Sequence, residues 1–152
     1  MHRAFAAICI LTLLAGCAGG EDGMPGRHTL LPDTGRDFPS VWLSIPEGVS
    51  MRERSVGRDA RLYDFSLSGR TILGLYLGAN PTFAPADGAR EVESETVGGL
   101  PAKTVVARSG DRWSRDMLVT SRRPIFYHFY YRDLGGSDLI AADHIIGSLQ
   151  ER

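Results

Sequence analysis

An aromatic strand near the end of the chain holds the side chains best suited to binding chemistry. Residues 125–132 read Ile-Phe-Tyr-His-Phe-Tyr-Tyr-Arg, and strand alternation places Tyr127, Phe129 and Tyr131 on one face and His128 on the other. An imidazole can donate and accept hydrogen bonds near neutral pH, so a histidine among aromatic rings can hold a small ligand. Such rings are also common in strands as ordinary packing. These four residues are the candidate surface for a ligand or a partner.

Asp143 and His144 form a second pair of polar side chains, within the last apolar segment. Metal ligands on a helix are spaced three or four residues apart, so that they share one face. Adjacent residues point about 100° apart, so this pair suits a single ion poorly. We expect the two side chains to be solvated, and we expect no metal site.

The residues show no arrangement that is typical of an enzyme. The chain has no Gly-x-Ser-x-Gly motif, no phosphate-binding glycine loop and only two cysteines. We therefore expect no enzymatic activity and no cofactor.

The N-terminus carries the most specific motif of the chain. Arg3 precedes an apolar run over 4–15, which is shorter than the roughly 20 residues that a helix needs to span a bilayer. Residues 14–17 read Leu-Ala-Gly-Cys, which resembles the lipobox of bacterial lipoproteins. This resemblance implies that 1–16 are a signal peptide and that Cys17 becomes a lipidated N-terminus.

The same resemblance implies a place in the cell. The protein would be anchored through its lipid in the bacterial cell envelope, with acyl chains such as palmitate inserted in the membrane. Ala18 stands where an aspartate would retain the protein in the inner membrane, which favours the outer membrane and a domain facing the periplasm. Residues 17–37 are rich in glycine and include two prolines, so we expect a flexible tether with few contacts.

Charge and length bound the remaining possibilities. The chain of 152 residues has 17 Lys+Arg against 18 Asp+Glu, so it lacks the excess of positive charge that a dedicated nucleic-acid binder needs. We expect no nucleic-acid partner. The length leaves room for one ordinary domain, over 38–152.

The hydrophobic pattern predicts a sheet followed by a helix. A period of two dominates 38–132, and short turns with glycine separate the strands, which predicts one antiparallel meander. The period changes to that of a helix over 138–149, where an apolar stripe includes Ile146. Ser137 is placed to cap this helix, and we expect the stripe to pack across the sheet.

Three segments of this domain resemble the PsbP-like group. They are 38–48 (Phe-Pro-Ser-Val-Trp-Leu-Ser-Ile-Pro-Glu-Gly), 97–102 (Val-Gly-Gly-Leu-Pro-Ala) and 142–149, which ends in Ser-Leu. The resemblance implies an α+β fold, in which helices cover an antiparallel sheet. The alternative is a calycin-like β-barrel with a C-terminal helix, although the Gly-x-Trp typical of that group is missing around Trp42.

Domains that resemble the PsbP-like group act mostly as accessory, assembly or binding modules. The expected function is therefore that of a non-catalytic binding or assembly module of the cell envelope, with another envelope protein as its partner. The alternative is a binder of small apolar ligands that uses the aromatic residues of 125–132.

Overall fold

The fold is described here from a computed structural model, for residues 26–31 and 38–151. Within these ranges, ten strands and one helix follow one another along the chain. The strands are β1 (Gly26–Leu31), β2 (Val41–Pro46), β3 (Val49–Ser55), β4 (Ala60–Leu67), β5 (Arg70–Gly78), β6 (Arg90–Val97), β7 (Leu100–Ser109), β8 (Arg112–Thr120), β9 (Phe126–Leu134) and β10 (Gln150–Glu151). The helix α1 (Gly136–Gly147) lies between the last two strands.

Seven strands form a large open sheet in the order β3-β4-β5-β9-β8-β7-β6, and all its neighbours are antiparallel. The antiparallel pairing is confirmed, but the prediction of a simple meander is wrong at one point. After β5 the chain crosses to the far edge through 79–89 and returns hairpin by hairpin, so that β9 pairs with β5. Hairpin turns set only the pairing of consecutive strands, whereas the pairing of β5 with β9 depends on burial across the whole sheet.

The prediction that 38–132 form a single sheet is also wrong. Strand β2 lies in a second sheet of order β1-β2-β10. On β2, Val41, Leu43 and Ile45 are at most 2% exposed, while Pro46 leads into the turn at Glu47 and Gly48. This turn folds the small sheet back over the large one, so that both sheets bury one face in a shared core.

Part of the predicted tether is a strand. Residues 26–31 form β1, which pairs with β2 from Gly26 opposite Pro46 to Leu31 opposite Val41. The glycine and proline content of 17–37 indicated few contacts, but an unpaired edge of β2 offers backbone hydrogen bonds to a neighbouring segment whatever its composition. The other residues of the predicted tether that precede 26 or lie in 32–37 fall outside the described residues.

The predicted C-terminal helix is confirmed, and its ends differ slightly from the prediction. It spans Gly136–Gly147, and the N-cap is Gly135, with no capping bond from a side chain. Ser137 is therefore not the cap. Asp138 in the first turn is buried and forms an ion pair with Arg70 at the start of β5, so its role includes tying the helix to the large sheet.

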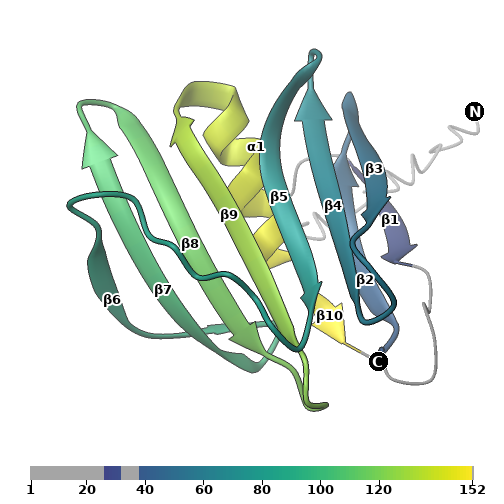
Figure 1. The fold of residues 1–152 in the computed structure, drawn as a ribbon. Coiled ribbons are helices and arrows are strands. Elements are labelled where there is room, and N and C mark those ends of the chain that lie inside the picture. The colour runs from purple at the N-terminus through teal and green to yellow at the C-terminus, as the bar shows by residue number, and fades with distance from the viewer. Residues whose placement is uncertain (1–25, 32–37, 152) are drawn as a thin grey trace, which may run out of the picture.

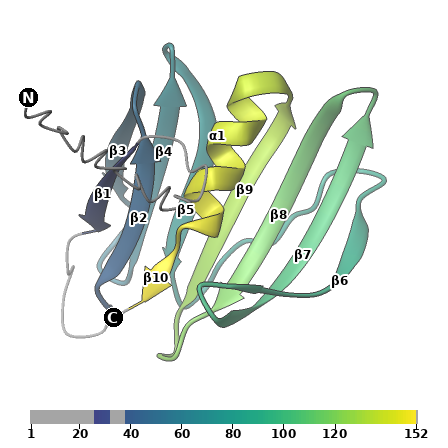
Figure 2. The ribbon, with the colours of Figure 1, turned by 180° about the vertical axis from the view of Figure 1, so that it is seen from behind.

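The molecule is layered, as Figures 1 and 2 show. Helix α1 and the small sheet cover one face of the large sheet, which we call the inner face, and the segment 79–89 runs over the opposite, outer face. The described residues thus form an α+β domain with an open sheet whose edges are β3 and β6, and not a closed barrel. Within the described ranges, no helix is long and apolar enough to cross a membrane.

Candidate functional site

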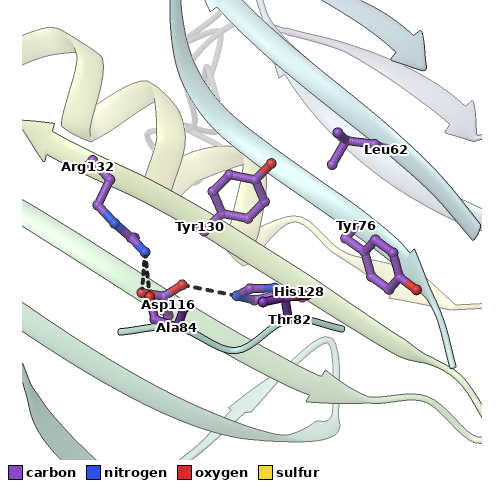
Figure 3. Close-up of a pocket in the computed structure, with 8 residues that line it drawn as sticks. All are labelled: Leu62, Tyr76, Thr82, Ala84, Asp116, His128, Tyr130 and Arg132. Carbon is purple, nitrogen blue, oxygen red and sulfur yellow. Dashed lines mark hydrogen bonds and ion pairs between the residues drawn. The ribbon is translucent and has the colours of Figure 1, made fainter. Parts of the chain in front are cut away.

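The outer face of the large sheet carries a pocket beneath the segment 79–89, which we call the crossover loop. The pocket has a volume of about 280 Å³. Side chains from four strands and from the loop line it: Leu62, Tyr76, Thr82, Ala84, Asp116, His128, Tyr130 and Arg132. Figure 3 shows these side chains on strands β4, β5, β8 and β9, with Thr82 and Ala84 on the loop.

Strand register brings the floor of the pocket together. Leu62 on β4 stands opposite Tyr76 on β5, and Tyr76 stands opposite His128 on β9. In the next row, Tyr130 stands opposite Asp116 on β8. Because side chains of alternate residues share a face, these rows point to the same side of the sheet. The pocket is therefore built by rigid strands and only roofed by a loop.

Asp116 is the centre of a buried polar cluster. Its Oδ1 lies 3.1 Å from Nε2 of His128, and its Oδ2 lies 2.9 Å from Nη2 of Arg132. Asp116 and His128 are only 2% and 4% exposed. A buried carboxylate is costly unless it is paired, and here both oxygens have partners. In this cluster the carboxylate accepts, so Nε2 of His128 donates to it, and in the neutral imidazole Nδ1 is then a hydrogen-bond acceptor.

Arg132 also holds the crossover loop. Its Nη2 donates to the carbonyl oxygen of Ala84 at 3.0 Å, and its Nη1 donates to the carbonyl oxygens of Tyr131 and Arg115. The ring of Phe83 lies next to the ring of His128, with 5.7 Å between centroids. The loop is thus fastened above the pocket by one arginine and one aromatic contact.

Two tyrosine rings form the walls of the pocket. Figure 3 shows the rings of Tyr130 and Tyr76 on either side of the space between Leu62 and His128. The Tyr130 ring lies 5.3 Å from that of His128, and burial, with a further contribution from the charge of Asp64, raises the pKa of the Tyr130 hydroxyl. The hydroxyl therefore stays protonated at physiological pH.

The four candidate residues of the aromatic strand separate onto two faces. His128 lies in the pocket, whereas Tyr127, Phe129 and Tyr131 point to the inner face and are at most 4% exposed. The hydroxyl of Tyr127 donates to Glu151 at 2.9 Å. These three rings are part of the packed core and do not line the pocket. Burial raises the pKa of the Tyr127 and Tyr131 hydroxyls well above the ordinary value of a tyrosine.

Of the residues that line the pocket, only His128 was among the predicted ones; Asp116 and Arg132, which form the polar cluster with it, were not. The alternation of β9 already puts Arg132 on the same face as His128, so that residue could have been found from the sequence. Asp116 lies on the strand before β9, which the predicted meander already pairs with β9, but its place beside His128 depends on the register of that hairpin, which alternation alone does not give. Cys17, the predicted lipidation site, lies outside the described residues.

Asp143 and His144 do not converge on one point, and both are partly exposed, but each also makes a contact that the prediction of a solvated face did not include. Oδ1 of Asp143 accepts hydrogen bonds from Arg115 at 3.0 Å and from the hydroxyl of Tyr131 at 3.1 Å. Nε2 of His144 lies 3.2 Å from Oγ of Ser44 on β2. The two side chains point to different sheets, so they join the helix to both. Among residues 26–31 and 38–151, no group of three or more His, Cys, Asp or Glu side chains could hold a metal ion.

Comparison with known proteins adds little to this geometry. No family model and no curated protein matches the chain. Among solved structures, the chain is similar to a crystal structure of a protein from Bacteroides thetaiotaomicron, with a TM-score of 0.40 and 16% sequence identity. The similarity covers 74% of this chain and 45% of that one, so this chain spans less than half of that protein's length.

Proposed function

We propose that this protein is a lipid-anchored, non-catalytic binding module of the bacterial cell envelope, and that its binding site is the pocket under the crossover loop. The anchor is argued from residues 14–17, which read Leu-Ala-Gly-Cys after an apolar run. In this proposal Cys17 carries the lipid, and the domain faces the periplasm from the outer membrane. The PsbP-like resemblance belongs to the same proposal, because such domains mostly bind or assist other components.

One observation carries the choice of site. Asp116 is buried with both carboxylate oxygens occupied, and it holds His128 and Arg132 in place at the bottom of a pocket with tyrosine walls. Holding a carboxylate and an imidazole in a nearly dry environment costs stability that an apolar pair would not cost. Ligand sites combine apolar and aromatic walls with a few fixed polar groups, which describes this pocket.

Of the two binding modes expected from the sequence, the geometry favours a small ligand over an envelope protein. A volume of about 280 Å³ is close to the lower end of the range for small-molecule sites. The loop roof limits access to the floor, whereas an interface for a folded protein is broad and open. The ligand would bind on the outer face at His128, and not at the inner-face rings of Tyr127, Phe129 and Tyr131.

Crosslinking in living cells tests this proposal. A photoreactive amino acid replaces Thr82, an exposed residue on the rim of the pocket, and the matched control replaces Ile140, which is 60% exposed on α1. We expect the purified Thr82 variant to carry an added small-molecule mass that the Ile140 variant lacks. A protein adduct at Thr82 would favour the envelope partner instead. Equal adducts at both positions, or none at either, would contradict a binding site in this pocket.

The anchor has its own test. In the variant Cys17→Ser, the signal segment is not processed by the lipoprotein route, so we expect the protein to leave the membrane fraction or to keep its full precursor mass. Fractionation and mass spectrometry of the intact protein measure both outcomes. A variant that stays in the membrane with the mass of the mature wild type would refute the lipid at Cys17.

A further inference from the structure

The charges in and around the pocket are already balanced in pairs. Asp116 faces Arg132 at 2.9 Å, and on the neighbouring strands Asp64 lies 2.7 Å from Nε of Arg54. Arg132 also donates to three backbone carbonyl oxygens, so its guanidinium has few hydrogens left for a ligand. An anionic ligand would lose its hydration, and the attraction of Arg132 would be offset by the negative charge of Asp116. A cationic ligand would likewise lose its hydration, and the attraction of Asp116 would be offset by the positive charge of Arg132. The electrostatics therefore favour a neutral ligand.

The walls favour a flat ring. Leu62 and the rings of Tyr76 and Tyr130 line the space, and Figure 3 shows the two rings on its opposite sides. Aromatic rings prefer offset-stacked or edge-to-face contacts with other rings, which add to the gain from burial. An engineered apolar cavity of about 150 Å³ holds benzene. A pocket of about 280 Å³ thus has room for a ring system of roughly two fused rings.

The floor of the pocket favours a ligand with one hydrogen-bond donor. Nε2 of His128 is engaged by Asp116, and among the described residues no protein group bonds the second ring nitrogen, Nδ1. A ligand without a donor would cover this acceptor and leave it unsatisfied, which is unfavourable. A ligand with one N–H or O–H group would satisfy it.

We propose that the pocket binds a small neutral aromatic molecule with one N–H or O–H donor, which lies between Tyr76 and Tyr130 and donates to Nδ1 of His128. This inference rests on the proposed function and specifies the chemical class of its ligand. Phe83 packs against the His128 ring from the loop, with 5.7 Å between ring centroids, and so helps to hold the imidazole in place.

The probe for this proposal is indole, which has two fused rings and a single N–H donor. The full chain in detergent micelles, with ¹⁵N-labelled histidine, is titrated with indole while the ring nitrogens of His128 and His144 are followed by NMR. We expect a saturable shift at His128, with a Kd of about 1 mM or tighter for a ligand of this size. His144 bonds to Ser44 on the other side of the sheet, so its ring should not shift.

Two comparisons isolate the donor and the ring. 1-Methylindole keeps the ring system and its preference for micelles but lacks the N–H, so we expect it to bind at least about tenfold more weakly. Tyr130→Ala removes one wall, and we expect a loss of about tenfold for indole with the His144 signals unchanged. If Tyr130→Ala disturbs the fold, the two ligands compared on the wild-type chain still decide the question.

The outcomes separate this inference from the proposed function. Equal affinities for indole and 1-methylindole, equal shifts at His128 and His144, or no shift with either ligand would overturn the inference. A small-molecule adduct at Thr82 together with any of these results would leave the pocket as the binding site, with a ligand of another class. Absence of both the adduct and the shift would overturn both proposals.

Discussion

The ring of Tyr130 occupies the space in which a side chain at position 74 would stand. Gly74 on β5 is directly opposite Tyr130 on β9, and a Cβ added to Gly74 would lie 2.3 Å from Cζ of the tyrosine. The glycine lets the ring lie flat across β5, and this arrangement keeps the wall of the pocket close to the sheet. An aromatic side chain that covers a glycine on the neighbouring strand is a recognised way of stabilising a sheet.

The first prediction concerns this pair. Gly74→Ala must push the Tyr130 ring away, so we expect it to lower the free energy of unfolding by about 1–3 kcal/mol. In a Tyr130→Ala background the same change has no ring to displace, and its cost should fall by at least half. Urea denaturation of the four proteins in this double-mutant cycle measures the coupling. Gly147→Ala is the control, because an added Cβ there meets no atom within 4 Å. Strictly additive effects of the two changes would contradict the contact.

The second prediction concerns the apolar stripe of α1. Ile146 is 2% exposed in the core between the helix and the sheets, so we expect Ile146→Ala to cost about 2–5 kcal/mol of unfolding free energy. Ile140 lies on the same helix but is 60% exposed, and Ile140→Ala should change stability by no more than about 0.5 kcal/mol. Thermal and urea denaturation of both variants give the comparison. Similar losses for the two variants would show that the helix does not bury this face.

The third prediction uses two adjacent glycines in the turn between β6 and β7. Both have positive φ, 59° at Gly98 and 77° at Gly99, so alanine is strained at either position. Only at Gly98 would the added Cβ also approach backbone, at 2.1 Å from the carbonyl oxygen of Leu149. We expect Gly99→Ala to cost about 1 kcal/mol and Gly98→Ala clearly more. Chemical denaturation ranks them, and the opposite ranking would mean that the turn does not contact the end of the chain.

The fourth prediction concerns the pH dependence of stability at Asp143. Burial raises the pKa of this carboxyl above its ordinary value of 3.8, against the opposing effects of the Arg115 charge and the Tyr131 hydroxyl. In the folded state the group therefore holds its proton to a higher pH than in the unfolded state. The free energy of unfolding that it contributes must fall as the pH rises from 3.8 through the raised pKa, and it is constant below and above this window.

The measurement is the difference in unfolding free energy between the wild type and Asp143→Asn, followed from below pH 3.8 to neutral pH. As the pH rises through this window, we expect the wild type to lose unfolding free energy relative to the asparagine variant. Ile140→Ala, which changes no titratable group, should give a difference independent of pH over the same range. A difference that moves in favour of the wild type would show that the ion pair with Arg115 outweighs the burial of the carboxylate.

Local patterns in the sequence determined the kind of element along most of the chain. Alternation assigned the faces of β9 correctly, and turns such as that at Gly110 contain glycines with positive φ that mark where hairpins reverse. The change of period after residue 137 predicted the helix and the burial of Ile146. These features depend on the neighbours of each residue along the chain, so the sequence alone was sufficient to predict them.

The arrangement of these elements was decided only by the tertiary structure. Alternation tells which residues share a face of a strand, but it does not tell which strand lies alongside. The crossing of 79–89 to the far edge places β9 between β5 and β8, and the pairing of β5 with β9 brings Tyr76, and Leu62 beyond it, alongside His128, with the loop above them. The strand β1 likewise forms because β2 offers an edge, which the composition of its own residues does not indicate. The sequence thus determined most of the elements, and residues 14–17 predict a membrane anchor, whereas the pocket is a product of long-range pairing.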